Sequence, residues 1–326
     1  MASGSKETAL RRQKQLLGHF LNKEHTLSVN PKDHIKCVSV YGAGVMGGGI
    51  AQVVAAAGYK VTLWDMQQSD IDHGIQAIRK SLERLAKKQA AGNAATWVEA
   101  TMSRITWTTD KRKAAKQADL IIEAIVESLA IKQALFAELD KVAHMHCVFA
   151  TNTSSLLVSD VAALLPRKRR TVALHFFNPV PLMKLVEVAY MDDGYDAALV
   201  DLLKAWVYDV GKVPVVCKDR PGFIVNRLVV PFNSEARMLV ERGDASVEDV
   251  DTAMKLGAGH PMGPFELMDL TGIDVGYHIA KGWYDNAPGL QGDPRFKPSS
   301  HVEKMIKDGH LGRKTGQGYY NYKQTK

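Results

Sequence analysis

The stretch ALHFFNPVPLMKLVEV, residues 173–188, contains one histidine and one glutamate in otherwise mostly apolar surroundings. The side chain of His175 changes its charge near neutral pH, so it suits proton transfer to and from a substrate. Glu187 is the acidic residue of the stretch. By themselves these residues favour a buried, hydrogen-bonded structural histidine over a catalytic base. Choosing between a structural histidine and a catalytic base requires knowing which elements of the fold surround His175.

A glycine-rich turn indicates phosphate binding. Gly42, Gly44 and Gly47 have the spacing G-x-G-x-x-G, directly after an apolar strand pattern at residues 36–41 and at the start of an alanine-rich helical pattern. The first glycine permits a tight turn, the second lets the main chain approach a pyrophosphate, and the third lets the helix pack closely on the strand. Asp65 ends the next strand pattern about twenty residues on, where a carboxylate binds an adenosine ribose and repels the extra phosphate of NADP. The turn therefore predicts NAD as cofactor.

Apolar, β-rich runs continue along the chain, mostly separated by helical periodicity, and this alternation predicts a mostly parallel sheet covered by helices. These runs span residues 118–125, 146–152, 170–176 and 212–219. Polar residues follow the first three runs, and in such sheets ligands bind at the carboxyl ends of the strands. They are Glu127, Asn152, Thr153, Ser154, His175 and Asn178. We expect them to gather at one edge, which is the first reason to regard His175 as functional.

Single residues of this group also have ordinary structural interpretations. Ser154 suits the N-cap of a following helix, and Asn178 suits the turn before Pro179. Asn226, further along, reads equally well as a polar residue inside a helix. Spacing alone does not choose between these roles and direct contact with a ligand.

The pattern changes from strands to helices after Asp219, and Ser246 with the acidic residues behind it is typical of a helix start. We therefore predict an N-terminal extension over residues 1–32, a Rossmann-type doubly wound domain over 33–219, and a smaller all-helical domain over 220–326. A length of 326 residues is consistent with two domains.

Composition excludes several classes of protein. Every apolar run is shorter than the roughly 18 residues of a membrane span, so membrane insertion is not expected. The three cysteines are an odd number that fits a reducing compartment, and no His, Cys and carboxylate cluster has metal-ligand spacing, so no metal is predicted. The net charge is +7. Basic residues are concentrated at 79–116, which suits a polyanionic ligand or an ordinary solvated surface, but no nucleic-acid recognition motif accompanies them.

Residues 1–30 combine a basic amphipathic pattern, LRRQKQLLGHFL, with few acidic residues. Such a pattern is typical of a mitochondrial presequence. A structured or added extension is the alternative. The first interpretation places the protein in the mitochondrial matrix and the second in the cytoplasm.

Several ordered motifs together resemble the L-3-hydroxyacyl-CoA dehydrogenase family of the short-chain, monofunctional type, from about residue 35 to 322. They are VYGAGVMGGGIAQ, EAIVES, TNTSSL, LHFFNPVPLMKLVEV, KDRPGFIVNR, GDASVEDVDTAMKLGAGHPMGPFELMD and KTGQGYYNY. The stretch YMDDGYDAA after Glu187 departs from the family pattern, which leaves that loop in question.

The resemblance implies reversible, NAD-dependent oxidation of a (S)-3-hydroxyacyl-CoA to a 3-ketoacyl-CoA in fatty acid β-oxidation. It makes His175 the general base, pairs it with Glu187, and adds Ser154 and Asn226 to the catalytic group. It places acyl-CoA against Ser81, Lys88, Ser154, Asn178 and Asn226. The residues implied to contact NAD are Gly42, Gly44, Val45, Met46, Gly47, Asp65, Glu127, Lys132, Asn152 and Lys314. A homodimer formed through the helical domain is also implied.

Two alternatives remain at this point. One is a 3-hydroxybutyryl-CoA dehydrogenase that prefers NADPH and works in the reductive direction, against which Asp65 argues. The other is a dinucleotide-binding structural relative that has lost the reaction, as crystallin-like proteins can. Retention of His175, Glu187, Ser154 and Asn226 together argues against it.

Overall fold

The chain divides into two compact units between Phe223 and Ile224. The computed structural model describes residues 29–89 and 93–322, so the presequence pattern lies outside the described residues. Within those two ranges, no helix combines the length and the apolar character needed to cross a membrane. The two units are taken in turn below.

The first unit is built on one eight-stranded sheet with the strand order β3-β2-β1-β4-β5-β6-β7-β8. The strands are β1 (Cys37–Tyr41), β2 (Lys60–Trp64), β3 (Ile105–Thr108), β4 (Leu120–Glu123), β5 (Val148–Thr151), β6 (Thr171–Phe176), β7 (Leu185–Tyr190) and β8 (Val213–Lys218). All neighbours run parallel except β6 and β7, which are antiparallel. The predicted mostly parallel, doubly wound sheet is confirmed, and β3 and β7 lie outside the apolar runs on which that prediction was based.

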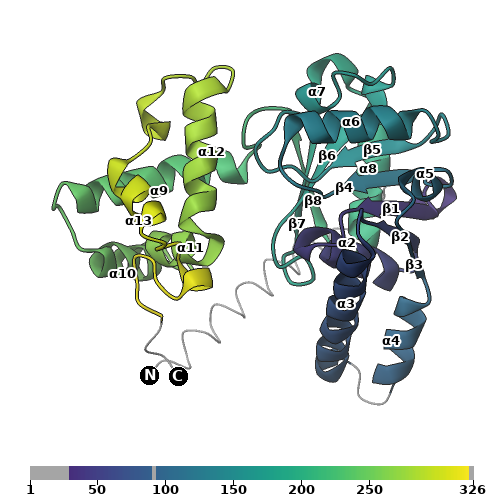
Figure 1. Cartoon of the computed structure of the whole chain (residues 1–326), viewed down its shortest axis with the longest axis horizontal. Helices are drawn as coiled ribbons and strands as arrows, with labels where there is room; N and C mark the ends of the chain where they lie inside the picture. The colour runs from purple at the N-terminus through teal and green to yellow at the C-terminus, as the bar shows by residue number, and fades with distance from the viewer. Residues whose placement is uncertain (1–28, 90–92, 323–326) are drawn as a thin grey trace. The chain divides into compact units, whose positions relative to one another are not determined.

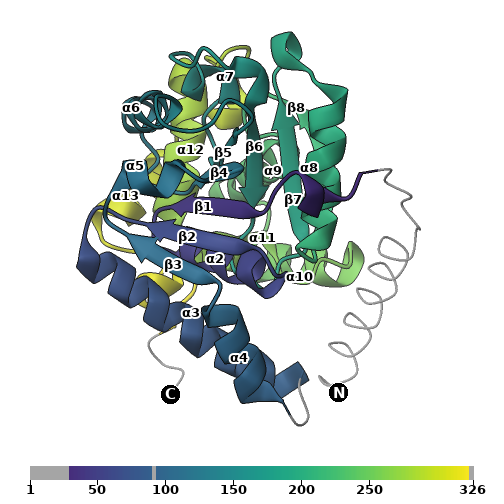
Figure 2. The same cartoon turned by 90° about the vertical axis from the view of Figure 1, so that its right-hand side faces the viewer.

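Helices cover both faces of this sheet (Figures 1 and 2). They are α2 (Val45–Ala56), α3 (Gln68–Gln89), α4 (Ala94–Met102), α5 (Lys111–Ala115), α6 (Leu129–Asp140), α7 (Val158–Val161) and α8 (Ala197–Asp209), with short 3-10 turns η1 (Pro31–Asp33), η2 (Lys168–Arg170) and η3 (Asp192–Gly194). One apolar core joins the sheet to α2, α3, α4 and α8, and a second joins it to α5, α6 and α7. Because side chains alternate along a strand, Leu174 and Phe176 in the first core leave His175 facing the second.

The second unit is helical. It consists of α9 (Val225–Glu241), α10 (Val247–Gly257), α11 (Pro264–Thr271), α12 (Ile273–Asn286) and α13 (Ser300–Lys307), with the short turns η4 (Pro294–Phe296) and η5 (Arg313–Thr315). The Ser246 side chain accepts a hydrogen bond from the Asp249 main-chain N–H, so it caps α10 as predicted. Pro231 lies within α9.

Two carboxylates hold the C-terminal KTGQGYYNY motif on these helices. Asp269 accepts the main-chain N–H groups of Tyr319 and Tyr320 at 2.9 Å each. Asp251 accepts the hydroxyl of Tyr320 at 2.8 Å and the N–H of Phe265 at 2.8 Å. Both aspartates are almost fully buried, and charged acceptors give strong hydrogen bonds in such surroundings. The motif is therefore part of the framework of the second unit.

The glycine turn after β1 has the geometry that its sequence predicts. Gly42 has a φ of 105°, and a Cβ there would lie 2.5 Å from the Ala124 carbonyl oxygen. A Cβ on Gly47 would lie 1.8 Å from the Gly42 carbonyl oxygen, so α2 packs too closely on the turn for any side chain. A Cβ on Gly44 would meet nothing within 4 Å. Gly42 and Gly47 are thus required by close packing, whereas Gly44 borders open space beside the helix N-terminus.

This difference gives a stability test. Gly47→Ala forces the turn and the helix apart, and overpacking of this kind costs about 1–3 kcal/mol, enough to lower Tm by several degrees in a domain of this size. Gly44→Ala should lower Tm of the cofactor-free protein much less, because a Cβ there meets no atom and only the N-cap preference for glycine is lost. Thermal unfolding of both variants without cofactor checks this, and an unaltered Tm for Gly47→Ala would contradict the packing argument.

Candidate active site

The antiparallel pairing of β6 with β7 brings His175 and Glu187 together. The register places them directly opposite each other, and directly opposed residues project to the same face of a sheet. His175 Nδ1 lies 2.8 Å from Glu187 Oε2. Glu187 is fully buried and His175 is 4% exposed, so water scarcely competes for this contact. The geometry fixes the ring orientation, and an N–H on Nδ1 would donate to the carboxylate.

The other ring nitrogen meets a hydroxyl. His175 Nε2 lies 3.1 Å from Ser154 Oγ, in the loop between β5 and α7. The ring centroids of Phe177 and Phe223 lie 4.5 Å and 5.8 Å from that of the imidazole. Helix α7 begins at Val158 with Leu157 in the N-cap position, so capping does not explain Ser154. A Glu187–His175–Ser154 chain results, enclosed by aromatic rings.

Phe223 occupies this position with a left-handed backbone. Its φ is 49°, which residues other than glycine adopt infrequently, and it follows Gly222 at φ 80°. Sparsely populated conformations of this kind are concentrated at functional sites. Phe223, the last residue of the first unit, therefore packs on the histidine.

A second charged group lies beside the first, beyond the ends of β4 and β5. Glu127 accepts hydrogen bonds from the hydroxyls of Thr153 and Ser155, and Lys132 Nζ lies 3.1 Å from its Oε2. Lys132 is 1% exposed and donates to Glu123 Oε1 at 2.5 Å. A buried ammonium needs such partners because it has lost its water.

The pKa of Glu127 follows from these contacts. The protein around the carboxyl displaces water and by itself would raise the pKa, but the Lys132 charge and the Thr153 and Ser155 hydrogen bonds outweigh this, so the pKa is lowered. Glu127 is therefore held as a carboxylate that organises the loop carrying Ser154.

Glu123 is a residue that sequence reasoning missed. It is fully buried at the end of β4, where it accepts the Thr151 hydroxyl at 2.8 Å as well as the Lys132 ammonium. Its signal in the sequence is a charge that ends the apolar run LIIE. Such a residue needs a buried cationic partner, and the chain supplies one on the helix that follows.

Except for Lys314, the remaining residues predicted at the cofactor site lie near the glycine turn or on the sheet. Asp65 Oδ2 accepts the main-chain N–H of Ala43 at 2.7 Å, so its carboxylate lies against the turn. A carboxylate has about four lone-pair positions, which leaves capacity for ribose hydroxyls. Asn152 Oδ1 accepts the N–H of Phe176 at 2.8 Å, next to His175. Val45 and Met46 begin α2, whose N-terminus faces the turn.

The other predicted residues lie further from this group in the chain. Ser81 and Lys88 are in α3, and Asn178 is exposed in the loop after β6. Asn226 lies at the start of α9 in the second unit, and Lys314, in η5, is paired with Asp274 Oδ1 at 2.6 Å. Part of the positive charge of residues 79–116 is offset, because Arg79 pairs with Glu99 and Lys111 with Glu138.

The chain matches the family models described as 3-hydroxyacyl-CoA dehydrogenase, NAD binding domain, over residues 37–220, and 3-hydroxyacyl-CoA dehydrogenase, C-terminal domain, over residues 222–322. It is 48% identical over 295 residues to the Homo sapiens hydroxyacyl-coenzyme A dehydrogenase, mitochondrial, covering 89% of this chain and 92% of that protein. A probable 3-hydroxybutyryl-CoA dehydrogenase of Bacillus subtilis is 38% identical over 290 residues, with coverage of 89% and 98%. The structure resembles that of the (S)-3-hydroxybutyryl-CoA dehydrogenase of Ralstonia eutropha, with a TM-score of 0.82, 34% identity and coverage of 89% and 100%.

The charge network of Glu127 predicts a pH-dependent stability. Because the folded pKa is lowered, the contribution of the carboxylate is fully present above the unfolded value of about 4.3 and is lost as the pH falls through the lowered value. The Glu127 side chain is 39% exposed, so solvent screens part of its attraction to Lys132. Glu127→Gln should therefore reduce the free energy of unfolding by only about 0.5–1 kcal/mol at pH 7, and this difference should vanish toward pH 3. Denaturant unfolding at several pH values measures it, with the exposed Glu83→Gln as control. A difference that is independent of pH would exclude the ionic explanation.

Proposed function

The chain belongs to the 3-hydroxyacyl-CoA dehydrogenase family, and on this basis we propose that His175 is the general base of the reaction and Glu187 its orienting acid. The activity is the NAD-dependent oxidation of a 3-hydroxyacyl-CoA to the 3-ketoacyl-CoA. The observation that supports these roles is the buried Glu187–His175–Ser154 chain, with distances of 2.8 Å and 3.1 Å. Because Nδ1 of His175 faces Glu187, Nε2 is the ring nitrogen that exchanges a proton with the substrate.

This geometry supports the following proton transfer. As the hydride leaves C3 of the substrate, Nε2 of His175 takes the proton of the C3 hydroxyl, and in reduction it returns that proton. The imidazolium formed is stabilised by the Glu187 carboxylate on Nδ1, which also keeps the tautomer that leaves Nε2 free to accept. Burial of the pair strengthens this attraction, because few waters screen it.

Ser154 and the asparagines supply neutral groups for the substrate oxygen. Ser154 Oγ lies within hydrogen-bonding distance of Nε2, so a hydroxyl bound next to it would meet both groups. We propose that Ser154 and Asn226 stabilise the charge that develops on this oxygen without adding a competing base. Asn178, exposed after β6, contributes to binding of the thioester on the same proposal.

NAD is the cofactor, and it supplies a ring that accepts the hydride when it is bound. The residues fit such a group: the turn leaves open space at Gly44, α2 directs its free N–H groups toward that space, and Asp65 lies against the turn. Glu127, Lys132, Asn152 and Lys314 complete the set that we propose holds the dinucleotide. Ser81 and Lys88 on α3 would bind the coenzyme A portion of the substrate, a polyanion that suits the basic residues there.

We propose that the protein is a homodimer that associates through the second unit. Large apolar side chains are exposed on its helices, namely Leu228, Leu256, Leu270 and Val275, with Leu256 83% exposed. Contiguous exposed apolar patches mark interaction surfaces, and these side chains support the proposal if they lie in one patch. Sedimentation equilibrium tests this proposal, and a monomeric mass at micromolar concentration would reject it.

The mitochondrial matrix is the location we propose, from the basic amphipathic pattern of residues 1–30 and the mitochondrial name of the human relative. A reporter fused behind residues 1–34 tests it, since cytosolic retention of the fusion would reject the proposal.

The central test is a comparison of wild type with His175→Gln. We expect wild type to oxidise NADH rapidly with acetoacetyl-CoA and NADPH far more slowly, because Asp65 repels the additional phosphate. His175→Gln should lower kcat by about 10²–10⁴-fold, the usual contribution of a general base, while the NADH dissociation constant changes less than about twofold. Steady-state rates and fluorescence titration measure these quantities. Unchanged turnover in His175→Gln would remove His175 from the mechanism, and a preference for NADPH would favour the reductive alternative.

A further inference from the structure

Lys212 is a buried lysine outside the residues discussed so far. It is 2% exposed, and its ammonium donates to two main-chain carbonyl oxygens, Val180 at 2.5 Å and Met183 at 2.8 Å. Burial lowers the pKa of Lys212 to about 8, with a further contribution from neighbouring Lys184. At neutral pH the group is thus mostly a cation, which forms stronger hydrogen bonds than a neutral donor.

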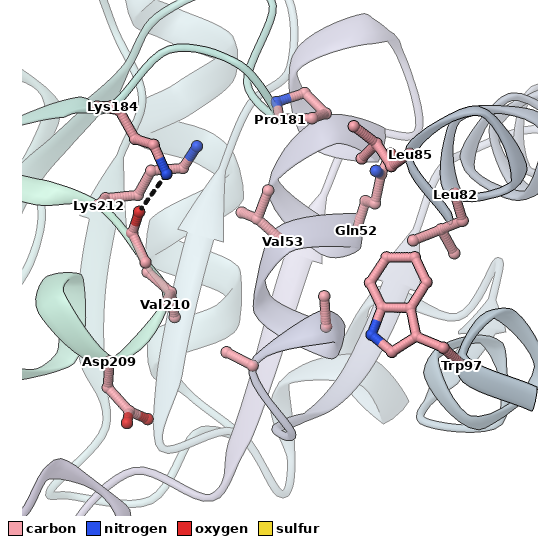
Figure 3. A pocket seen from close by; sticks show the side chains of 13 residues that line it. Gln52, Val53, Leu82, Leu85, Trp97, Pro181, Lys184, Asp209, Val210 and Lys212 are labelled. Carbon is pink, nitrogen blue, oxygen red and sulfur yellow. Dashed lines mark hydrogen bonds between the residues drawn. The ribbon is translucent and has the colours of Figure 1, made fainter. Parts of the chain in front are cut away.

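The end of α8 fixes where this side chain begins. Helix α8 ends at Asp209, and Gly211 follows with a φ of 76°, the left-handed conformation that reverses the chain after a helix. The Lys212 main-chain N–H then donates to Val207 at 3.0 Å. Its Cα is therefore held by the helix end, and its long stem delivers the ammonium to the loop before β7. Figure 3 shows Lys212 beside Lys184 and Pro181, at one side of a pocket lined also by α2, α3 and α4.

The loop that receives these hydrogen bonds joins the two catalytic strands. It spans residues 177–184, after His175 in β6 and before Glu187 in β7. Inside it, the Pro179 carbonyl accepts the N–H groups of Leu182 and Met183 at 2.9 Å and 3.0 Å. This local turn leaves the carbonyls of Val180 and Met183 without a partner within the loop, and Lys212 satisfies both.

The same loop also contacts the helix of the dinucleotide turn. Val180 is buried against Gly49 of α2, where a Cβ on the glycine would lie 2.8 Å from Val180 Cβ. A shift of Val180 would therefore move the ends of β6 and β7 relative to α2, on which the loop packs. Close placement of reacting groups is what such a framework protects, and a displacement of about 1 Å can cost roughly 10²-fold in rate.

We propose that Lys212 is a positioning residue for the dehydrogenase reaction: by holding the carbonyls of Val180 and Met183 it fixes the loop that sets His175 against Glu187. Lys212 acts through these two residues and touches no substrate. The inference rests on the roles proposed above for His175 and Glu187.

The experiment compares Lys212→Met with wild type in the acetoacetyl-CoA assay, well below the Tm of the variant. Methionine keeps the apolar stem and removes the donors, so kcat should fall by about 10–100-fold while KM for NADH changes less than about twofold. Lys184→Met is the matched control, because it removes an exposed lysine of the same loop that makes one 3.3 Å hydrogen bond to Gly211. It should keep kcat within about twofold of wild type. Wild-type kcat in folded Lys212→Met would overturn the proposal.

A double variant separates positioning from general stability. If Lys212 acts through His175, then His175→Gln with Lys212→Met should turn over no more slowly than His175→Gln alone, because residues that act as a unit are not additive. The same fold-loss from Lys212→Met in both backgrounds would reject the proposal. Failure of the proposed function looks different: His175→Gln would then keep wild-type turnover whatever Lys212→Met does.

If Lys212→Met does not fold, Lys212→Gln replaces it, since glutamine keeps N–H donors on a shorter neutral chain. It should show a partial loss of kcat, with KM for NADH again within about twofold of wild type. Wild-type kcat, or a loss confined to KM, would count against positioning.

Discussion

The antiparallel register of β6 and β7 is the constraint on which the candidate active site depends. A parallel neighbour, as elsewhere in the sheet, would not follow from a loop as short as residues 177–184, since parallel strands need a crossover of about a dozen residues or more. Reversal through this short loop lets one continuous segment carry both His175 and Glu187, the proposed base and its proposed orienting acid. A one-residue slip would move Glu187 to the opposite face and leave the histidine without its carboxylate.

Buried charge recurs around this pair, and each instance is matched by partners. Lys132 lies between two glutamates, Glu187 faces the imidazole, and Lys212 meets two carbonyls. Removing such groups from water is costly, so each has value only while its partners stay in place. The consequence is a site whose parts tolerate little displacement, which suits a reaction that needs hydride and proton acceptors in fixed positions.

The two units hold their loops and motifs in place by different means. In the first unit, parallel strands and covering helices place loops at one edge of the sheet, and the candidate active site lies among those loops. In the second, the buried aspartates Asp251 and Asp269 fasten the C-terminal motif to the helices. The segment at Gly222 and Phe223 lies where the units divide, and its left-handed backbone brings an aromatic ring to His175.

The sequence alone determined the features that depend on local pattern. The glycine spacing with Asp65, the alternation of strands and helices, and the cap at Ser246 are each read within about twenty residues, and the ordered motifs identified the family. Tertiary structure decided what depends on partners distant in the chain. It showed that Ser154 contacts His175 instead of capping α7, that Glu123 and Lys132 form one buried pair, and that Lys212 reaches across to the loop before β7. The reason is physical: a histidine or lysine in an apolar run has the same local pattern whether its partner is water, a carbonyl or a carboxylate, and only the packing of remote strands supplies that partner.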